Sequence, residues 1–174
     1  MQLQVVPYSP ADHLSQTVEM LLNVRRADPT YPPSVDAEFT ALAFEHWLIV
    51  DKVLARWVAL SGTKVVGHIA LAEPHDYISS FFSSPQCVAM QHEPLGEIVK
   101  FFVDPSQQGR GVGATLLRHT IDSAWELGRQ PVLAVVSESR AARRLYARMG
   151  LTELGIFDGI HGRNHVFLEE KIPR

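Results

Sequence analysis

The sequence is poor in three features that would point to particular classes of protein: cysteine, long apolar runs and an excess of positive charge. The single cysteine, Cys87, has no second cysteine with which to form a disulfide, which suits a reducing compartment. No apolar run approaches the ~20 residues of a membrane-spanning helix, and the first residues lack the basic segment and apolar core of a signal peptide. The 16 Lys and Arg residues are outnumbered by 19 Asp and Glu, so nucleic-acid binding has no general electrostatic support. We therefore expect a cytoplasmic protein with neither a membrane nor a nucleic-acid partner.

The bulk composition is that of an ordinary globular protein. Hydrophobic residues make up 46% of the 174 residues and charged residues 20%. A chain of this length buries roughly two thirds of its unfolded surface. We find no internal repeat, low-complexity tract or linker, and expect one domain over residues 1–174.

The spacing of apolar residues predicts helices interspersed with strands. Ser9-Pro10 and Ser139 are expected to begin helices as N-caps, whereas the segment from Pro74 to Pro94 is expected to be irregular. The mixture of hairpin and crossover connections predicts an α/β (α+β) fold with a mixed sheet and helices on both faces. The expected elements are a strand at Leu3–Pro7, a helix from Pro10, a helix over Asp36–Val50, strands at Leu54–Leu60, Val65–Ala72 and Glu97–Val103, a helix over Val112–Gly128, a strand at Pro131–Val136, a helix from Ser139 to Met149, and strands at Leu151–Phe157 and Asn164–Glu170.

A glycine-rich run, Gln108 to Gly113, stands between a predicted strand and a predicted helix. Glycines at such a junction let backbone N–H groups approach a phosphorylated ligand, and the helix N-terminus behind them favours an anion. A Walker-type nucleotide loop is excluded because the run lacks Gly-Lys followed by Ser or Thr. A dinucleotide fingerprint matches at Gly109, Gly111 and Ala114, with Glu138 as the acidic residue, but the first glycine does not directly follow its strand. An ordinary tight turn is the remaining alternative to a pyrophosphate cradle.

Two segments resemble a known family. The run from Glu97 to Gly113, read as a strand ending Val-Asp-Pro and then Gln-x-x-Gly-x-Gly, resembles the acyl-CoA-binding motif of the GNAT superfamily of N-acetyltransferases. The run from Ala142 to Leu151 resembles the pattern A-x-x-x-Y-x-x-x-G-F of that family. The resemblance is specific over Glu97–Phe157 and rests on the order of elements before that.

The resemblance implies a largely antiparallel twisted sheet of about seven strands, the GNAT fold. It also implies direct transfer of an acetyl or other acyl group from acetyl-CoA to a primary amine in a ternary complex, with no metal. The acceptor would be a small molecule or a peptide. The cofactor contacts that it implies are Phe102, Val103, Gln108, Gly109, Arg110, Gly111, Val112, Gly113, Ala114, Ser139 and Arg143. Ser139 stands where the family commonly has asparagine, so its contact with the pantetheine arm is the least supported of these.

Two residues have catalytic roles by the same resemblance. Glu97 stands at the position of the family's general base, and Tyr146 at that of the acid that protonates the leaving thiolate. The competing interpretations are a solvated carboxylate at a strand end for Glu97 and core packing for Tyr146. A non-catalytic acyl-CoA-binding module, which needs neither residue, is the alternative function.

Acceptor recognition is expected from the parts least like the family. These parts are the turn around Tyr31, the helix with Phe44 and Trp47, and the segment Pro74–Pro94. The alternative role of this segment is a homodimer contact, since exposed Phe81 and Phe82 would be a liability on a monomer. His161 and His165 are four residues apart without a helix to align them, so we expect no metal site there.

Overall fold

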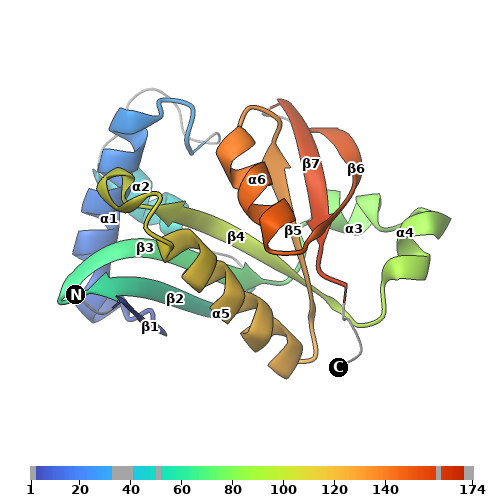
Figure 1. Cartoon of the computed structure of the whole chain (residues 1–174), viewed down its shortest axis with the longest axis horizontal. Coiled ribbons are helices and arrows are strands. Elements are labelled where there is room, and N and C mark those ends of the chain that lie inside the picture. The colour runs from blue at the N-terminus through green and yellow to red at the C-terminus, as the bar shows by residue number, and fades with distance from the viewer. Residues whose placement is uncertain (1–2, 33–40, 50–51, 160–161, 171–174) are drawn as a thin grey trace. The chain divides into compact units, whose positions relative to one another are not determined.

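Seven strands form one hydrogen-bonded sheet in the part of the chain that the computed structural model describes, residues 3–32, 41–49, 52–159 and 162–170. The strand order is β1-β2-β3-β4-β5-β7-β6 (Figure 1). The elements are β1 (Leu3–Pro7), α1 (Pro10–Ala27), α2 (Ala41–Leu48), β2 (Val53–Ser61), β3 (Lys64–Ala72), α3 (Asp76–Phe81), α4 (Pro85–Met90), β4 (Leu95–Val103), the short 3-10 helix η1 (Pro105–Gln107), α5 (Val112–Glu126), β5 (Gln130–Val136), α6 (Arg140–Arg148), β6 (Thr152–Gly159) and β7 (Gly162–Leu168).

The chain divides into two compact units. The first comprises Met1–Leu71 with Val99–Thr120, and the second comprises Ala72–Ile98 with Ile121–Arg174. The division falls near the end of β3 and inside β4 and α5, so no single cut in the sequence separates the units. The expectation of one domain over residues 1–174 stays a prediction.

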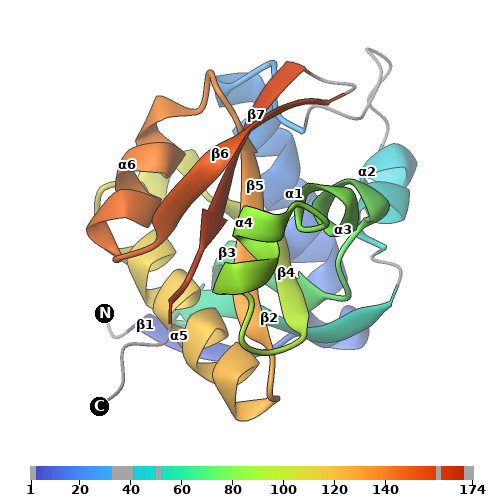
Figure 2. The ribbon, with the colours of Figure 1, turned by 90° about the vertical axis from the view of Figure 1, so that its right-hand side faces the viewer.

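The first unit packs helices on both faces of its strands. On one face, α1 and α2 bury a core against β2 and β4 that includes Leu21, Phe44, Val58 and Phe102. On the other face, the start of α5 packs on Gly67, where an added Cβ atom would come 2.6 Å from Cδ1 of Leu116. Glycine at this position therefore allows the helix to lie close to the strand (Figure 2).

The second unit has the same layering around β5 and β7. β5 runs parallel to β4 and antiparallel to β7, and β7 pairs in turn with β6. Val166 and Leu168 of β7 pack with α3 and α4, whereas Phe167 faces Tyr146 of α6. Because successive strand residues point to opposite faces, this alternation places α6 on one face and α3 with α4 on the other (Figure 2).

Most of the predicted elements are confirmed, including the mixed sheet with helices on both faces. The described part of the second predicted helix is α2, while residues 36–40 and 50 lie outside the described residues. The prediction that Ser9 and Ser139 stand at N-cap positions is confirmed for α1 and α6, although neither side chain makes a capping hydrogen bond.

The prediction of an irregular segment from Pro74 to Pro94 was wrong, because it contains α3 and α4. Ser84 caps α4 by accepting a hydrogen bond from the N–H of Cys87, and Pro85 occupies the first turn. The helices are too short to show a period of 3.6 residues, which is why the pattern missed them.

The expected exposure of Phe81 and Phe82 was wrong as well. Phe82 is 4% exposed and belongs to the core cluster of the second unit, and Phe81 is half-buried against it. The argument for a homodimer contact through these two rings is therefore removed.

Candidate active site

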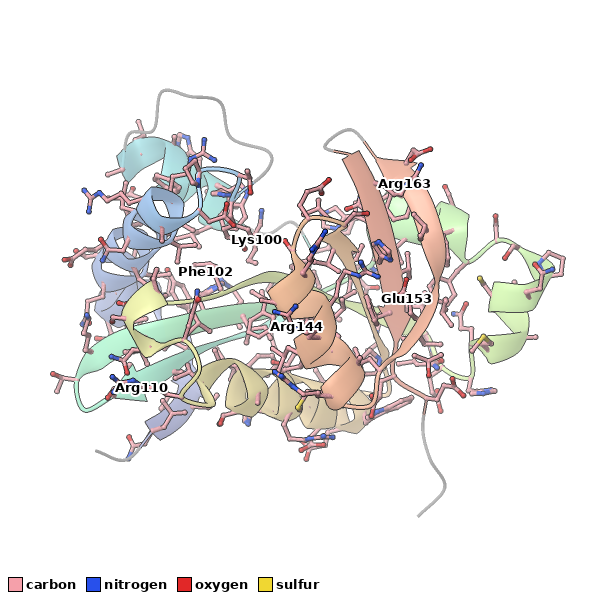
Figure 3. All side chains as sticks on the ribbon, turned by 45° about the horizontal axis from the view of Figure 1, so that its top comes forward. Lys100, Phe102, Arg110, Arg144, Glu153 and Arg163 are labelled. Atoms are coloured by element: carbon pink, nitrogen blue, oxygen red, sulfur yellow. The ribbon has the colours of Figure 1, made fainter. Side chains whose placement is uncertain are left out.

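The glycine run forms an open loop between β4 and α5. Gly109 and Gly111 have φ angles of +75° and +86°, the left-handed region that favours glycine. A Cβ atom at either position would meet no heavy atom of the described residues within 4 Å, and both glycines are exposed. The loop thus presents main chain to the outside at the N-terminus of α5, and Arg110 projects from the same loop (Figure 3). Val112 is buried at the start of α5, and Gly113 and Ala114 follow it within the helix.

Asp104 anchors the chain just before this loop. Its Oδ1 accepts hydrogen bonds from the N–H of Ser106 (2.9 Å) and from Oγ of Ser106 (2.6 Å), and its Oδ2 lies 3.4 Å from Nζ of Lys64. Burial by itself would raise the pKa of the Asp104 carboxyl, but the Ser106 hydrogen bonds and Lys64 outweigh it and lower that pKa below its ordinary value. The turn that leads from β4 to the glycines is therefore held by an ionised carboxylate.

β4 departs from regular strand geometry immediately before the predicted cofactor contacts. Lys100 has a φ angle of +52°, and two side chains bind carbonyl groups here: Nδ1 of His68 lies 2.7 Å from the Lys100 oxygen, and the Tyr31 hydroxyl donates to the Phe101 oxygen at 3.2 Å. Phe102 is then buried in the core, and Val103 is half-buried. The irregularity lies at the strand where the resemblance expects an acyl group to be held.

Glu97 lies on the same strand but within the second unit, and it is buried rather than solvated. Its residue exposure is 1%, and both carboxylate oxygens are bound. Oε2 accepts the backbone N–H of His75 at 2.8 Å and lies 2.8 Å from Nδ1 of the same residue. Oε1 accepts the Tyr77 hydroxyl at 2.5 Å. The interpretation of Glu97 as a solvated strand-end carboxylate was therefore wrong.

The contacts of His75 and Tyr77 with the candidate base were not revealed by the sequence. Both belong to the segment that was expected to be irregular, and neither stands in a motif. The charge of Glu97 contributes, after burial, to a pKa of the Tyr77 hydroxyl well above its ordinary value. Only the folding of α3 against β4 could show that these two residues meet the candidate base.

The phenol of Tyr146 lies in the interior on the inner side of α6. The residue is 6% exposed, and its ring meets that of Phe167 edge-on with centroids 5.5 Å apart. Burial raises the pKa of Tyr146 above its ordinary value, so the phenol stays protonated at neutral pH. The core packing considered as an alternative role is thus present, and it is compatible with the role of an acid.

Of the other two predicted contacts in the second unit, one lies at the start of α6 and one lies within it. Ser139 is the N-cap residue. Arg143 places Nη2 3.5 Å from Oε2 of Glu153 on β6, and its Nε is buried without a hydrogen-bond partner among the described residues. Arg144 is exposed on the same helix (Figure 3). The guanidinium group of Arg143 is therefore already paired with a carboxylate of the protein, that of Glu153.

A row of hydrogen-bonded polar side chains runs across the strands beside α6. His165 of β7 is 6% exposed, with Nδ1 2.5 Å from Oε1 of Glu153 and Nε2 3.0 Å from Oγ of Ser137. The hydrogen bond from His165 and the charges of His165 and Arg143 lower the pKa of Glu153 despite partial burial. The described residues contain no group of three or more metal-ligating side chains, and His161 lies outside them.

The residues named for acceptor recognition occupy different environments. Phe44 is fully buried in the core of the first unit, so its proposed role at an acceptor site was wrong. Trp47 is half-buried, with Nζ of Lys100 3.8 Å above its ring and the Tyr31 ring 5.8 Å away edge-on. In the second unit, a cavity of about 240 Å³ opens at the β6–β7 hairpin and is lined by Ile156, Phe157, Asp158 and Arg163.

None of the described helices has the length and apolar character needed to span a membrane.

Comparisons with known proteins point to the same family as the motifs in the sequence. A family model described as the acetyltransferase (GNAT) family matches residues 18–151. Over 62 residues, 35% of this chain, the sequence is 40% identical to a mycothiol acetyltransferase of Streptosporangium roseum, of which the match covers 18%. It is 35% identical over 71 residues, 40% of this chain, to an uncharacterised N-acetyltransferase of Methanocaldococcus jannaschii, of which 31% is covered. The matched segments therefore cover less than a third of the length of either relative.

The fold has close counterparts among solved structures. NAA60 of Arabidopsis thaliana, solved in complex with acetyl-CoA, superimposes with a TM-score of 0.68 at 17% identity over 97% of this chain and 98% of that one. The same protein in complex with a bisubstrate analogue gives a TM-score of 0.69 at 16% identity, with 97% of each chain covered. The predicted fold is thereby confirmed.

Proposed function

Because the chain belongs to the acetyltransferase (GNAT) family, we propose that it transfers an acetyl group from acetyl-CoA to a primary amine by direct attack in a ternary complex. The observation that carries this proposal is the open glycine loop at the N-terminus of α5, which follows β4 after the short helix η1. Family membership supports acyl transfer, and the choice of acetyl-CoA and of the acceptor is our inference.

The open main chain of the loop supports a role in binding the pyrophosphate of CoA. At Gly109 and Gly111 the space that a side chain would fill is open, so a ligand can approach the main chain there. The N–H groups from Gln108 to Gly113 would donate to the phosphate oxygens, with the dipole of α5 behind them and Arg110 adding a charged donor. Val112 and Ala114 would fix the first turn of the helix around them.

When bound, acetyl-CoA supplies a thioester whose carbonyl carbon is open to attack by an amine. Phe102 would pack beneath the pantetheine arm, and the N–H of Val103 would donate to the thioester oxygen as negative charge develops on it. Ser139 and Arg143 would contact the arm and the 3′-phosphate, with Arg143 leaving Glu153 to do so. In this arrangement β4 and α5 position the thioester without covalent participation of the protein.

Two proton transfers remain for side chains. The group formed by Glu97 and the two side chains bound to its carboxylate, His75 and Tyr77, would accept a proton from the acceptor amine. Tyr146 would donate the proton that the departing thiolate needs, for which a buried, protonated phenol is suited. The joint presence of both groups favours an enzyme over a module that only binds acyl-CoA.

The acceptor is a small-molecule or peptide amine in this proposal. In the first unit, Tyr31 and Trp47 are proposed to recognise it, since Phe44 is committed to the core. In the second unit, the segment Pro74–Pro94 and the cavity at the β6–β7 hairpin are proposed to do so. The binding of a bisubstrate analogue by NAA60 supports our choice of a ternary complex.

Two measurements test the function. Titration calorimetry with CoA tests the cradle, and release of free thiol from acetyl-CoA over lysine, spermidine and short peptides with a free N-terminus tests transfer. We expect association with CoA and amine-dependent thiol release. Absence of CoA binding would refute the whole proposal, whereas tight binding without thiol release for any amine would favour the non-catalytic module.

A further inference from the structure

The candidate base is sealed from solvent by two side chains of one short segment. Glu97 is 1% exposed, and its oxygens are bound by His75 and Tyr77. A carboxylate in this position exchanges protons with a substrate only through a group that touches both. The contacts around Glu97 therefore decide which atom meets the acceptor amine.

The segment between β3 and α3 places both rings on Glu97. His75 is the N-cap residue of α3, with φ −66° and ψ 160°, but its side chain turns to Glu97 instead of capping the helix. Ile78, fully buried, fixes α3 to the core. The His75 and Tyr77 rings are stacked, with centroids 5.3 Å apart and planes 9° from parallel, and Tyr77 stacks in turn on Phe157 at 5.6 Å.

Both rings reach the surface from this position. The His75 side chain is 47% exposed, and Tyr77 is 43% exposed. The rings thus connect a buried carboxylate to the side of the second unit where Phe157 lines the cavity at the β6–β7 hairpin.

Among these types of side chain, imidazole is the one whose ordinary pKa lies near neutral pH. Tyr77 keeps its proton, because burial and the neighbouring Glu97 raise the pKa of its hydroxyl. In the part of the chain that the structure describes, His75 and Tyr77 are the titratable groups that contact the carboxylate. On the neighbouring strand β5, the residue paired with Glu97 in the register is the apolar Val132.

We propose that His75 is the residue that takes the proton from the acceptor amine, and that Glu97 is the positioning residue that orients the imidazole and balances its charge. This inference rests on the proposed acyl transfer. With Nδ1 directed at Oε2 of Glu97, Nε2 is the nitrogen that takes up the proton. Tyr77 holds the second carboxylate oxygen and so fixes the rotamer of Glu97.

The proton balance is complete with groups already present. An acceptor ammonium gives its first proton to Nε2 of His75 and becomes a nucleophilic amine. As the amine nitrogen bonds to the acyl carbon and the carbon–sulfur bond breaks, Tyr146 protonates the sulfur, and the second nitrogen proton restores the phenol. His75 then releases its proton to solvent, so the net products are an amide, a thiol and one proton.

The pH dependence of transfer tests this assignment. We would compare the wild type with His75→Gln, Glu97→Gln and Tyr77→Phe, using acetyl-CoA and the amine panel above between about pH 6 and pH 9. His92, exposed in the same unit, provides the control His92→Gln. Calorimetry with CoA on each variant shows whether the cradle stays intact.

His75→Gln is expected to lower kcat/KM at neutral pH by about a hundredfold, with recovery at high pH where the acceptor is already deprotonated. Tyr77→Phe is expected to keep much of the activity but to move the acidic limb of the profile to higher pH, because the carboxylate loses a donor. A purely structural role would instead lower the rate by the same factor at every pH. A wild-type profile for His75→Gln would overturn the proposal while leaving the acyl transfer intact.

A spectroscopic measurement decides the matter if no amine in the panel is accepted. Nitrogen-15 NMR of the imidazole should show His75 protonated at Nδ1 at high pH and should show its titration midpoint falling in Glu97→Gln, because the imidazolium loses its carboxylate. An unchanged midpoint would overturn the dyad. Failure of CoA binding by the wild type, by contrast, would count against the proposed function itself.

Discussion

Nη2 of Arg56 lies 3.2 Å from Nε2 of His68, inside the first unit. His68 is fully buried, and its Nδ1 lies 2.7 Å from the carbonyl oxygen of Lys100. The carbonyl can only accept, so Nδ1 carries the proton, and Nε2 then accepts from the guanidinium. This pairing requires a neutral imidazole, in agreement with burial lowering the pKa of His68 to about 3.

The neutral His68 predicts a loss of stability in acid. Above pH 6.5 the imidazole is neutral in both folded and unfolded chains, but below it only the unfolded chain takes up the proton, so stability falls until about pH 3. Between neutral pH and pH 5 the contribution is about 2 kcal/mol. Urea unfolding at both pH values should show this drop in the wild type and in His92→Gln, and a smaller one in His68→Gln. An equal drop in all three proteins would refute the assignment.

Gly109 offers a test of the cradle with a matched control. Gly109 and Gly128 have φ angles of +75° and +67°, and both face open space where a Cβ atom would stand. Alanine at either site carries a similar backbone cost of about 1–2 kcal/mol. We expect Gly109→Ala to weaken CoA binding tenfold or more by calorimetry, because its methyl group occupies the space of the ligand, and Gly128→Ala to leave binding unchanged. Equal affinities of the two variants would place the pyrophosphate elsewhere.

Tyr146→Phe separates chemistry from binding. The ring keeps its contact with Phe167, and only the hydroxyl is lost. We expect kcat to fall by about a hundredfold, the scale of a lost general acid, while the Kd of CoA changes by less than about twofold. Steady-state kinetics and calorimetry on the same preparation measure both. Unchanged turnover would remove Tyr146 from the mechanism.

Gly67→Ala tests the packing of α5 on the strands. The new methyl group would press on Leu116 and Val112, at 2.6 Å and 3.1 Å. We expect the free energy of unfolding to fall by about 1–3 kcal/mol. Shortening the obstructing side chain with Leu116→Val should make the double variant more stable than the sum of the single effects predicts. Strict additivity in urea unfolding would show that this close approach is not the cause.

The sequence by itself determined the family and most of the elements, because those depend on short-range patterns. The order of strand, glycine run and helix over Glu97–Gly128 was predicted from the sequence. The need for glycine at positions 109 and 111 was confirmed by the positive φ angles of these residues. Helix-forming and strand-forming periods act between residues a few positions apart, so a single chain carries them directly.

Only the tertiary structure decided which side chains meet the candidate base. His75 and Glu97 are 22 positions apart, and their contact depends on how α3 folds back against β4. The same holds for Phe44 and Phe82, whose aromatic character did not tell whether they face a ligand or the core. Burial is a property of all the elements packed around a residue, and no local pattern in the chain encodes it.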